Sequence, residues 1–80
     1  MPLFLLHHTH ADRECGAAFA AWSGFDSPLR RGIAAASCVS GGHAVWWRVE
    51  ARDRQAALEQ LPPYVARRTQ VIAVRDVQIP

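Results

Sequence analysis

Three of the four histidines of this 80-residue chain fall within four consecutive positions, as His7, His8 and His10. On a β-strand, His8 and His10 project from one face about 6.5–7 Å apart at the backbone, so their ring nitrogens can converge on one ion. A helix that doubles back after this strand brings Cys15 near them. Imidazole together with a thiolate suits nickel, copper or zinc better than magnesium or calcium. The segment predicts a transition-metal site with His8, His10 and Cys15 as ligands.

Three other interpretations of this region stay open. The histidines can end a strand in solvent, or satisfy buried backbone groups. Alternatively, His8 or His10 can act as acid or base, because a histidine pKa near ~6.5 is useful at neutral pH. In that case Trp46 and Arg48 form a cofactor- or ligand-binding pair, Trp46 as a cavity wall and Arg48 as an anion clamp. The last alternative is an interaction module without a small ligand. The chain has no nucleophile–base motif, phosphate loop or cofactor fingerprint, so no particular reaction follows.

The elements that position these groups follow from the apolar pattern. The run Leu3–Thr9 is apolar on both alternating faces and predicts a strand inside a covered sheet. Asp12 predicts a helix cap, and Cys15 then begins an apolar stripe on a helix over residues 11–22. Asp53 predicts a second helix cap, and the pair Pro62-Pro63 stops or kinks that helix.

Three further strands complete the expected fold. Ile33–Ser40 and His43–Glu50 are joined by two glycines and predict a hairpin. Val71–Ile79 alternates apolar and polar residues and predicts an edge strand. The order β-α-β-β-α-β predicts an α+β domain over residues 1–80, ferredoxin-like, with a four-stranded antiparallel sheet and two helices on one face.

This expected topology also predicts which ligands can meet. With the first and third strands central and parallel, Glu50 lies near His8 and His10 and is an alternative third ligand. Cys38 and His43 then lie on the order of 15 Å away, at the other end of the sheet. We therefore do not expect one protomer to build a four-ligand metal site from His8, His10, Cys38 and His43. These four residues can meet only across a dimer interface.

Two helices cover only one face of such a sheet. The other face carries Trp46 and one side of the first strand, and an apolar face of that size is usually buried by a partner. We therefore expect a homodimer through the open sheet face. Which side of the first strand meets the helices stays open, because Leu3 and Leu5 are as apolar as Phe4 and Leu6.

Composition excludes several functions. The net charge is +2, and the nine basic residues are all arginine, so no lysine can form a Schiff base or serve a phosphate loop. The doublets Arg30-Arg31 and Arg67-Arg68 occur without a nucleic-acid-binding motif, and we expect no nucleic-acid partner. No apolar run is long enough to span a membrane, and we expect a cytoplasmic protein. There, Cys15 and Cys38 are expected as thiols, and as small core residues if they bind no metal.

The second half of the chain resembles a known pattern. The run from Trp46-Trp47-Arg48-Val49-Glu50-Ala51 through Ala56-Ala57-Leu58 to Val74-Arg75-Asp76-Val77-Gln78-Ile79-Pro80 is similar to the closing strand–helix–strand half of small, uncharacterised bacterial proteins of the dimeric α+β-barrel superfamily. Some of those proteins bind nickel. The resemblance implies a ferredoxin-like fold and modestly favours a metal ion, and it implies no particular ligand set.

Overall fold

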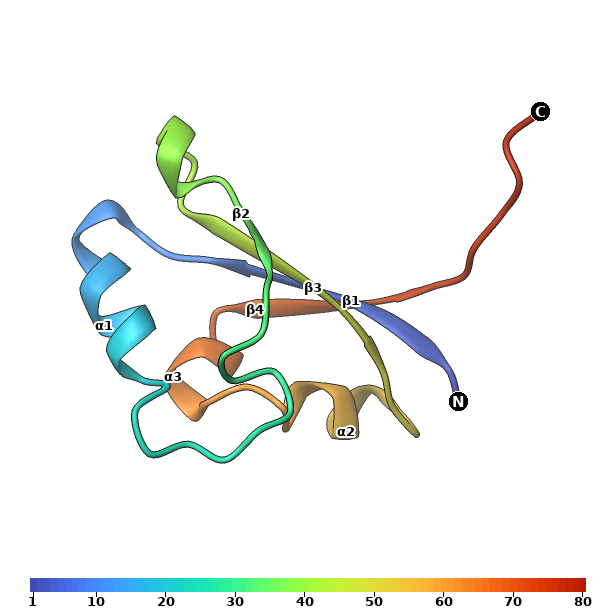
Figure 1. Ribbon diagram of the computed structural model, residues 1–80, viewed down its shortest axis with the longest axis horizontal. Helices are drawn as coiled ribbons and strands as arrows, with labels where there is room; N and C mark the ends of the chain where they lie inside the picture. Colours follow the sequence, from blue (N-terminus) through green and yellow to red (C-terminus); the bar gives the residue numbers. More distant parts are fainter.

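Strand β1 is central in the sheet of the computed structural model, which describes residues 1–80 (Figure 1). The strand order is β2-β3-β1-β4, and all neighbouring strands are antiparallel. The predicted α+β class and four-stranded antiparallel sheet are confirmed, whereas the ferredoxin-like assignment stays a prediction. The elements are β1 (Leu3–Thr9), η1 (Asp12–Glu14), α1 (Cys15–Ala20), β2 (Ala35–Ala36), η2 (Cys38–Ser40), β3 (Ala44–Glu50), α2 (Arg54–Leu58), α3 (Pro63–Ala66) and β4 (Thr69–Val74).

The structure decides which side of β1 faces the helices. Phe4, Leu6 and His8 are buried, whereas Leu3 and Leu5 are only half-buried on the opposite side. Side chains alternate between the two faces of a strand, so the histidines at even positions share the covered face with the apolar core.

The first and third strands are antiparallel, so the predicted parallel arrangement is wrong. Thr9 lies opposite Ala44, and Leu3 lies opposite Glu50. The N–H of His10 donates to the carbonyl of His43 at 3.1 Å, one position beyond the strand pairing. The end of β1 therefore meets the start of β3, and Glu50 lies at the far end of the sheet from His10.

The buried core lies between the sheet and the two C-terminal helices. Its seven members are Phe4, Leu6, Val49, Ala51, Ala57, Leu61 and Val65. None comes from residues 9–43, from which only Ala21, Trp22 and Leu29 pack against the core while partly buried. The segment between β1 and β3 therefore depends on other interactions for its position.

The first predicted helix is shorter and differently built than expected. A 3-10 turn over Asp12–Glu14 precedes α1, which ends at Ala20. Asp12 makes no cap hydrogen bond; the side chain of Glu14 instead accepts from the N–H of Ala11 at 2.8 Å. Phe19 is 57% exposed, so the predicted apolar stripe is only partly covered. A helix of six residues gains little stability by itself.

The second half follows its sequence signals more closely. The carboxylate of Asp53 accepts from the N–H of Ala56 at 2.8 Å and caps α2 as predicted. Pro63 begins α3, where a missing N–H is tolerated. β4 ends at Val74 and is an edge strand, so the predicted strand to Ile79 is too long. Residues 75–80 run away from the sheet (Figure 1).

The predicted hairpin forms with a very short first strand. Only Ala35 and Ala36 pair with β3. The side chain of Ser37 then accepts from the N–H of Ala44 at 3.1 Å, and the chain turns into η2. Small alanine side chains offer little packing area to extend such a strand.

The three α-helices lie on one side of the sheet (Figure 1). The predicted homodimer through the open side stays a prediction. No helix in the structure has the length and apolar character needed to cross a membrane.

Candidate metal centre

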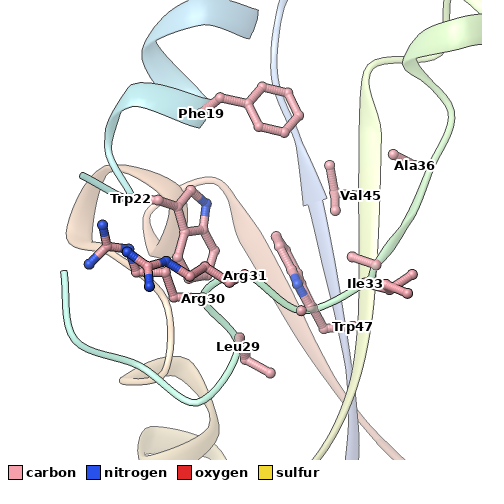
Figure 2. Close-up of a pocket in the computed structure, with 11 residues that line it drawn as sticks. Phe19, Trp22, Leu29, Arg30, Arg31, Ile33, Ala36, Val45 and Trp47 are labelled. Atoms are coloured by element: carbon pink, nitrogen blue, oxygen red, sulfur yellow. The ribbon is translucent and has the colours of Figure 1, made fainter. Parts of the chain in front are cut away.

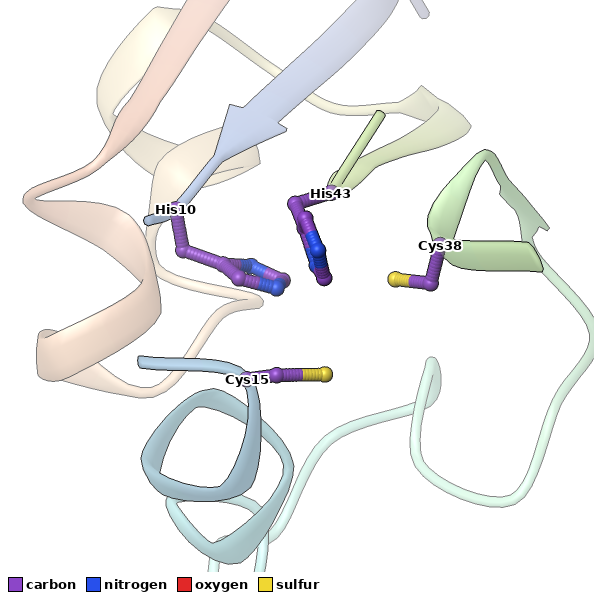
Figure 3. Close-up of side chains that lie close together, drawn as sticks. All are labelled: His10, Cys15, Cys38 and His43. Atoms are coloured by element: carbon purple, nitrogen blue, oxygen red, sulfur yellow. The ribbon is translucent and has the colours of Figure 1, made fainter. Parts of the chain in front are cut away.

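Two histidines and two cysteines converge where the end of β1 meets the start of β3. One ligand atom from each residue lies within 4.8 Å of all the others, and the four residues are His10, Cys15, Cys38 and His43. Figure 3 shows their side chains pointing toward one another from separate segments of the chain. Two ligands of one ion at about 2.3 Å are at most roughly 4.6 Å apart, so small side-chain movements suffice for all four to reach one ion.

His10 presents a free ring nitrogen to this group. Its Nδ1 lies 2.9 Å from Nε2 of His8, and Nδ1 of His8 lies 3.2 Å from the carbonyl oxygen of Val65. A carbonyl can only accept, so Nδ1 of His8 donates and its Nε2 accepts from Nδ1 of His10. The remaining Nε2 of His10 is buried without any partner. In this tautomer it carries a lone pair, as metal ligation requires.

Burial favours the neutral form of His8 that this chain of hydrogen bonds needs. Its side chain is 1% exposed, and burial lowers the pKa of His8 below its usual value, although the hydrogen bond to Val65 opposes that shift. Thr69 completes the arrangement by donating to the same carbonyl at 2.7 Å. His8 therefore orients His10 and has no nitrogen left for an ion.

His43, like His10, has one ring nitrogen with a hydrogen-bond partner and one without. Its Nε2 lies 2.9 Å from a carboxylate oxygen of Asp12, while its Nδ1 is buried without a partner. Metal-binding histidines commonly donate their second N–H to a carboxylate or carbonyl, which fixes the tautomer and the ring orientation. Both histidines of the group thus have an outer hydrogen-bond partner and an inner free nitrogen.

The two thiols are half-buried and adjacent. Neither forms a disulfide. Burial raises the pKa of the Cys15 thiol above its usual value, and the neighbouring Cys38 raises it further. Without a cation, the Cys15 thiol is therefore protonated near neutral pH. A metal ion that binds Cys15 displaces its proton, because the thiolate is the ligand.

Short turns place the four ligands. His10 follows the last residue of β1, and Cys15 is the first residue of α1. Cys38 begins η2, and His43 precedes β3 with a φ of +49°. A positive φ is uncommon outside glycine, so this backbone stores strain at a candidate ligand. A Cβ at Gly42 would collide with the side chain of Ser37, which explains glycine there.

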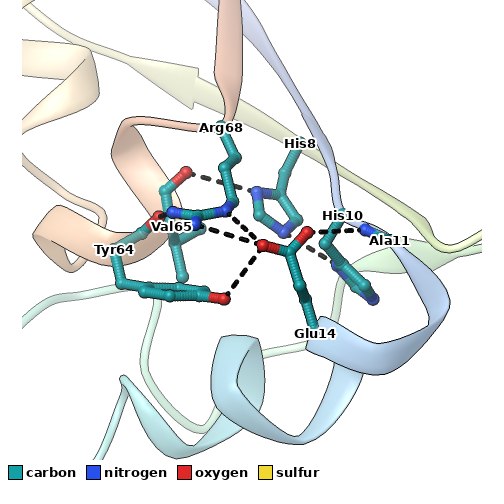
Figure 4. Close-up of polar contacts among 7 residues, drawn as sticks. All are labelled: His8, His10, Ala11, Glu14, Tyr64, Val65 and Arg68. Carbon is teal, nitrogen blue, oxygen red and sulfur yellow. Dashed lines mark hydrogen bonds and ion pairs between the residues drawn. The ribbon is translucent and has the colours of Figure 1, made fainter.

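A hydrogen-bonded brace holds the turn between His10 and Cys15 (Figure 4). The carboxylate of Glu14 accepts from the N–H of Ala11 at 2.8 Å, from the hydroxyl of Tyr64 at 3.3 Å and from Nε of Arg68 at 3.2 Å. The Ala11 bond, followed by the Arg68 contacts, holds the pKa of Glu14 below its usual value. The brace ties the ligand-bearing turn to α3 and to the residue preceding β4.

Only some of the predicted site residues belong to the four-residue group. His10 and Cys15 belong to the group, whereas His8 lies behind His10. Trp46 is on the open face of the sheet, where its ring stacks on His7 at 5.2 Å between centroids. Arg48 pairs with Asp76 at 2.6 Å. Trp46 and Arg48 both line a pocket of about 370 Å³ together with Leu29 and Ile33, and their role as a ligand-binding pair stays a prediction.

Cys38 and His43 were not expected to join His10 within one protomer, because the predicted topology made the first and third strands parallel. The expected separation of these residues from His10 is wrong, since antiparallel pairing brings the end of β1 to the start of β3. A signal was present: four residues separate His10 from Cys15, 22 separate Cys15 from Cys38, and four separate Cys38 from His43. Paired metal ligands at short, equal spacings are typical of zinc-binding sequences.

No family model, curated protein or solved structure matches this chain. The resemblance to nickel-binding barrel proteins therefore stays a prediction, and the geometry of the four residues carries the functional argument alone.

Proposed function

We propose that this protein binds one zinc ion through Nε2 of His10, Nδ1 of His43 and the sulfur atoms of Cys15 and Cys38. The observation that carries the proposal is the pair of buried imidazole nitrogens without partners, both beside the two thiols. Buried polar atoms are normally hydrogen-bonded. Two such exceptions, on histidines that each bring a ring nitrogen within 4.8 Å of two thiols, indicate a missing common partner that accepts lone pairs, which is a cation.

The ligand set supports zinc over the other transition metals. Two thiolates and two neutral imidazoles are a common structural zinc set, and the two thiolate charges balance Zn²⁺. Nickel(II) and copper(II) more often adopt square-planar or tetragonal geometry with nitrogen and oxygen ligands. Magnesium and calcium prefer oxygen ligands. Zinc is therefore the cation that these four groups fit best.

Four protein ligands make the proposed role structural. Catalytic zinc sites keep a position open for water or substrate, whereas closed sites stabilise the fold. Residues 9–43 contribute none of the seven members of the core cluster, and Ala18 is their one buried apolar side chain. Chains of this size often need a metal or disulfide in addition to their core. The ion would join β1, α1, η2 and the start of β3, and so hold this segment on the sheet.

Metal analysis of untagged protein tests the proposal. We expect one zinc ion per chain after purification without chelator. Cobalt replacement should give the intense visible absorption of a tetrahedral thiolate site. The double variant Cys15→Ser/Cys38→Ser should lose zinc binding and the cobalt–thiolate absorption. His7→Gln, which alters the one histidine on the open sheet face, should keep both.

Two results would contradict the zinc proposal. One is native protein that takes up no zinc when the metal is added during refolding. The other is full zinc stoichiometry in the double cysteine variant, because the ion would then be bound elsewhere.

A further inference from the structure

A second feature of the chain is an apolar pocket beside the metal centre. It has a volume of about 410 Å³, within the range of small-molecule sites. The pocket lies between α1, the segment 29–36 and β3. Its walls include Phe19, Trp22, Leu29, Ile33, Val45 and Trp47. In Figure 2, Trp22 lies on one side, Ile33 and Val45 lie on the other, and Trp47 lies between them.

Apolar side chains at this pocket are left uncovered. Ile33 is fully exposed and Phe19 is 57% exposed. Two indole rings line the same space, with Trp22 and Trp47 centroids 5.7 Å apart. Aromatic side chains provide large contact areas and favour offset or edge-to-face packing with another ring. The exposed surface therefore fits a flat aromatic group.

Two arginines give the pocket a positive side. Arg30 and Arg31 line it, no acidic residue does so, and neither guanidinium makes an ion pair or hydrogen bond in the structure. Figure 2 draws both arginine side chains on the Trp22 side of the pocket. Guanidinium groups present a planar set of donors that matches a carboxylate. The charge of the pocket therefore selects an anion.

We propose that this pocket binds a small aromatic carboxylate, with the ring against Trp22 and Trp47 and the carboxylate toward Arg30 and Arg31. The apolar walls supply the contact area, and the two unpaired guanidinium groups supply the preference for charge. Arg31 has a φ of +67°, a conformation that orients this part of the rim and is uncommon for a residue with a side chain.

Two walls of the pocket lie close in sequence to the two cysteines of the metal centre. Zinc binding should therefore affect ligand binding, an inference that rests on the proposed zinc site. Phe19 lies one turn after Cys15 on α1, and Ala36 lies two residues before Cys38. An ion held by both cysteines fixes the distance between these two walls. Removal of zinc should therefore weaken ligand binding, while the zinc content of the sample is measured separately.

The test uses 1-naphthoate and the uncharged 1-naphthalenemethanol, which share one ring system. Calorimetry on zinc-loaded protein should show one naphthoate per chain, bound about tenfold more tightly than the alcohol, since each exposed charge pair contributes up to about fivefold. Arg30→Gln/Arg31→Gln should make the two affinities equal. Arg67→Gln/Arg75→Gln removes the same charge elsewhere and should leave both unchanged.

A third variant tests the position of the ligand. Ala36 is exposed and lines the pocket, so Ala36→Trp should fill the space and weaken binding of both compounds. The pocket proposal is overturned if zinc-loaded native protein binds neither compound or binds both equally. It is also overturned if the Arg30/Arg31 variant keeps its preference for naphthoate. Zinc-free protein that binds naphthoate as tightly as the zinc-loaded protein would overturn the link between the pocket and the metal centre, while the measured zinc content tests the zinc proposal separately.

Discussion

Nε2 of His8 lies 2.9 Å from Nδ1 of His10, and this contact decides which nitrogen His10 turns toward the two cysteines. Because the carbonyl of Val65 accepts from the other nitrogen of His8, the direction of both hydrogen bonds is determined. A backbone carbonyl of α3 thus sets the tautomer of a residue that follows β1. The candidate metal centre is thereby connected to the core through a buried imidazole.

Substitution of His8 should lower the affinity for zinc without changing the number of zinc ions bound per chain. His8→Phe keeps an aromatic ring in the core and removes the acceptor for His10. We expect zinc affinity to fall by about 10–100-fold, measured by competition with a chromophoric chelator, with one ion still bound at saturation. His7→Phe is the matched control and should leave affinity unchanged. A loss of stoichiometry in His8→Phe, with the fold intact, would instead make His8 a direct ligand.

Asp12 should have a similar but smaller effect on His43. Its carboxylate lies 2.9 Å from Nε2 of His43 and is 93% exposed, so solvent screens the pair. Asp12→Asn should lower zinc affinity by about tenfold, the lower end for groups that orient a ligand. Asp26→Asn removes another exposed aspartate away from the centre and serves as the control. Equal affinities for the two variants would show that Asp12 does not orient His43.

Metal removal should loosen one half of the chain more than the other. Free zinc at 100 times its dissociation constant stabilises a folded protein by about 2.7 kcal/mol. For a domain of this size, that corresponds to a rise in Tm of about 10–20 °C. Calorimetry with and without chelator measures this shift.

Hydrogen exchange should locate the effect of metal removal. We expect chelator to reduce protection in residues 11–43, which contribute none of the seven members of the core cluster. Amides of β1, α2 and α3 should change less, because their apolar contacts do not involve the ion. Uniform loss of protection across the chain would contradict a local role for the metal.

The helix cap at Asp53 predicts a dependence of stability on pH. The N–H of Ala56, followed by Arg52, holds the pKa of Asp53 below its ordinary value of 3.8 in the folded chain. A lowered folded-state pKa stabilises the protein above the unfolded value, and this contribution is lost as pH falls through the folded value. Asp53→Ala should lower Tm by about 5 °C at pH 7.

This difference in Tm should stay constant between pH 7 and about pH 5, and then decrease below the ordinary aspartate pKa. Thermal unfolding of chelator-treated protein at several pH values measures it without interference from metal binding. Asp26→Ala is the control. A difference that is unchanged at pH 2 would show that the charge of Asp53 does not contribute to the cap.

Local sequence signals determined most of the regular structure. Alternating apolar residues identified β1 and β3, because strand side chains point to opposite faces. The same period placed Trp46 on the open face, and the structure has Val45 and Val49 buried on the covered one. Asp53 identified the start of α2, since its side chain bonds to the nearby N–H of Ala56. These features depend on residues a few positions apart.

The sequence also indicated a candidate transition-metal site, but not its four candidate ligands. The clustered histidines and Cys15 indicated a transition-metal site with nitrogen and sulfur ligands. Only the tertiary structure added Cys38 and His43 and moved His8 behind His10. A strand pattern has the same period in either direction, so it contains no information on whether β1 and β3 are parallel. The antiparallel pairing brings the end of β1 to the start of β3, and this decided which four residues face one another.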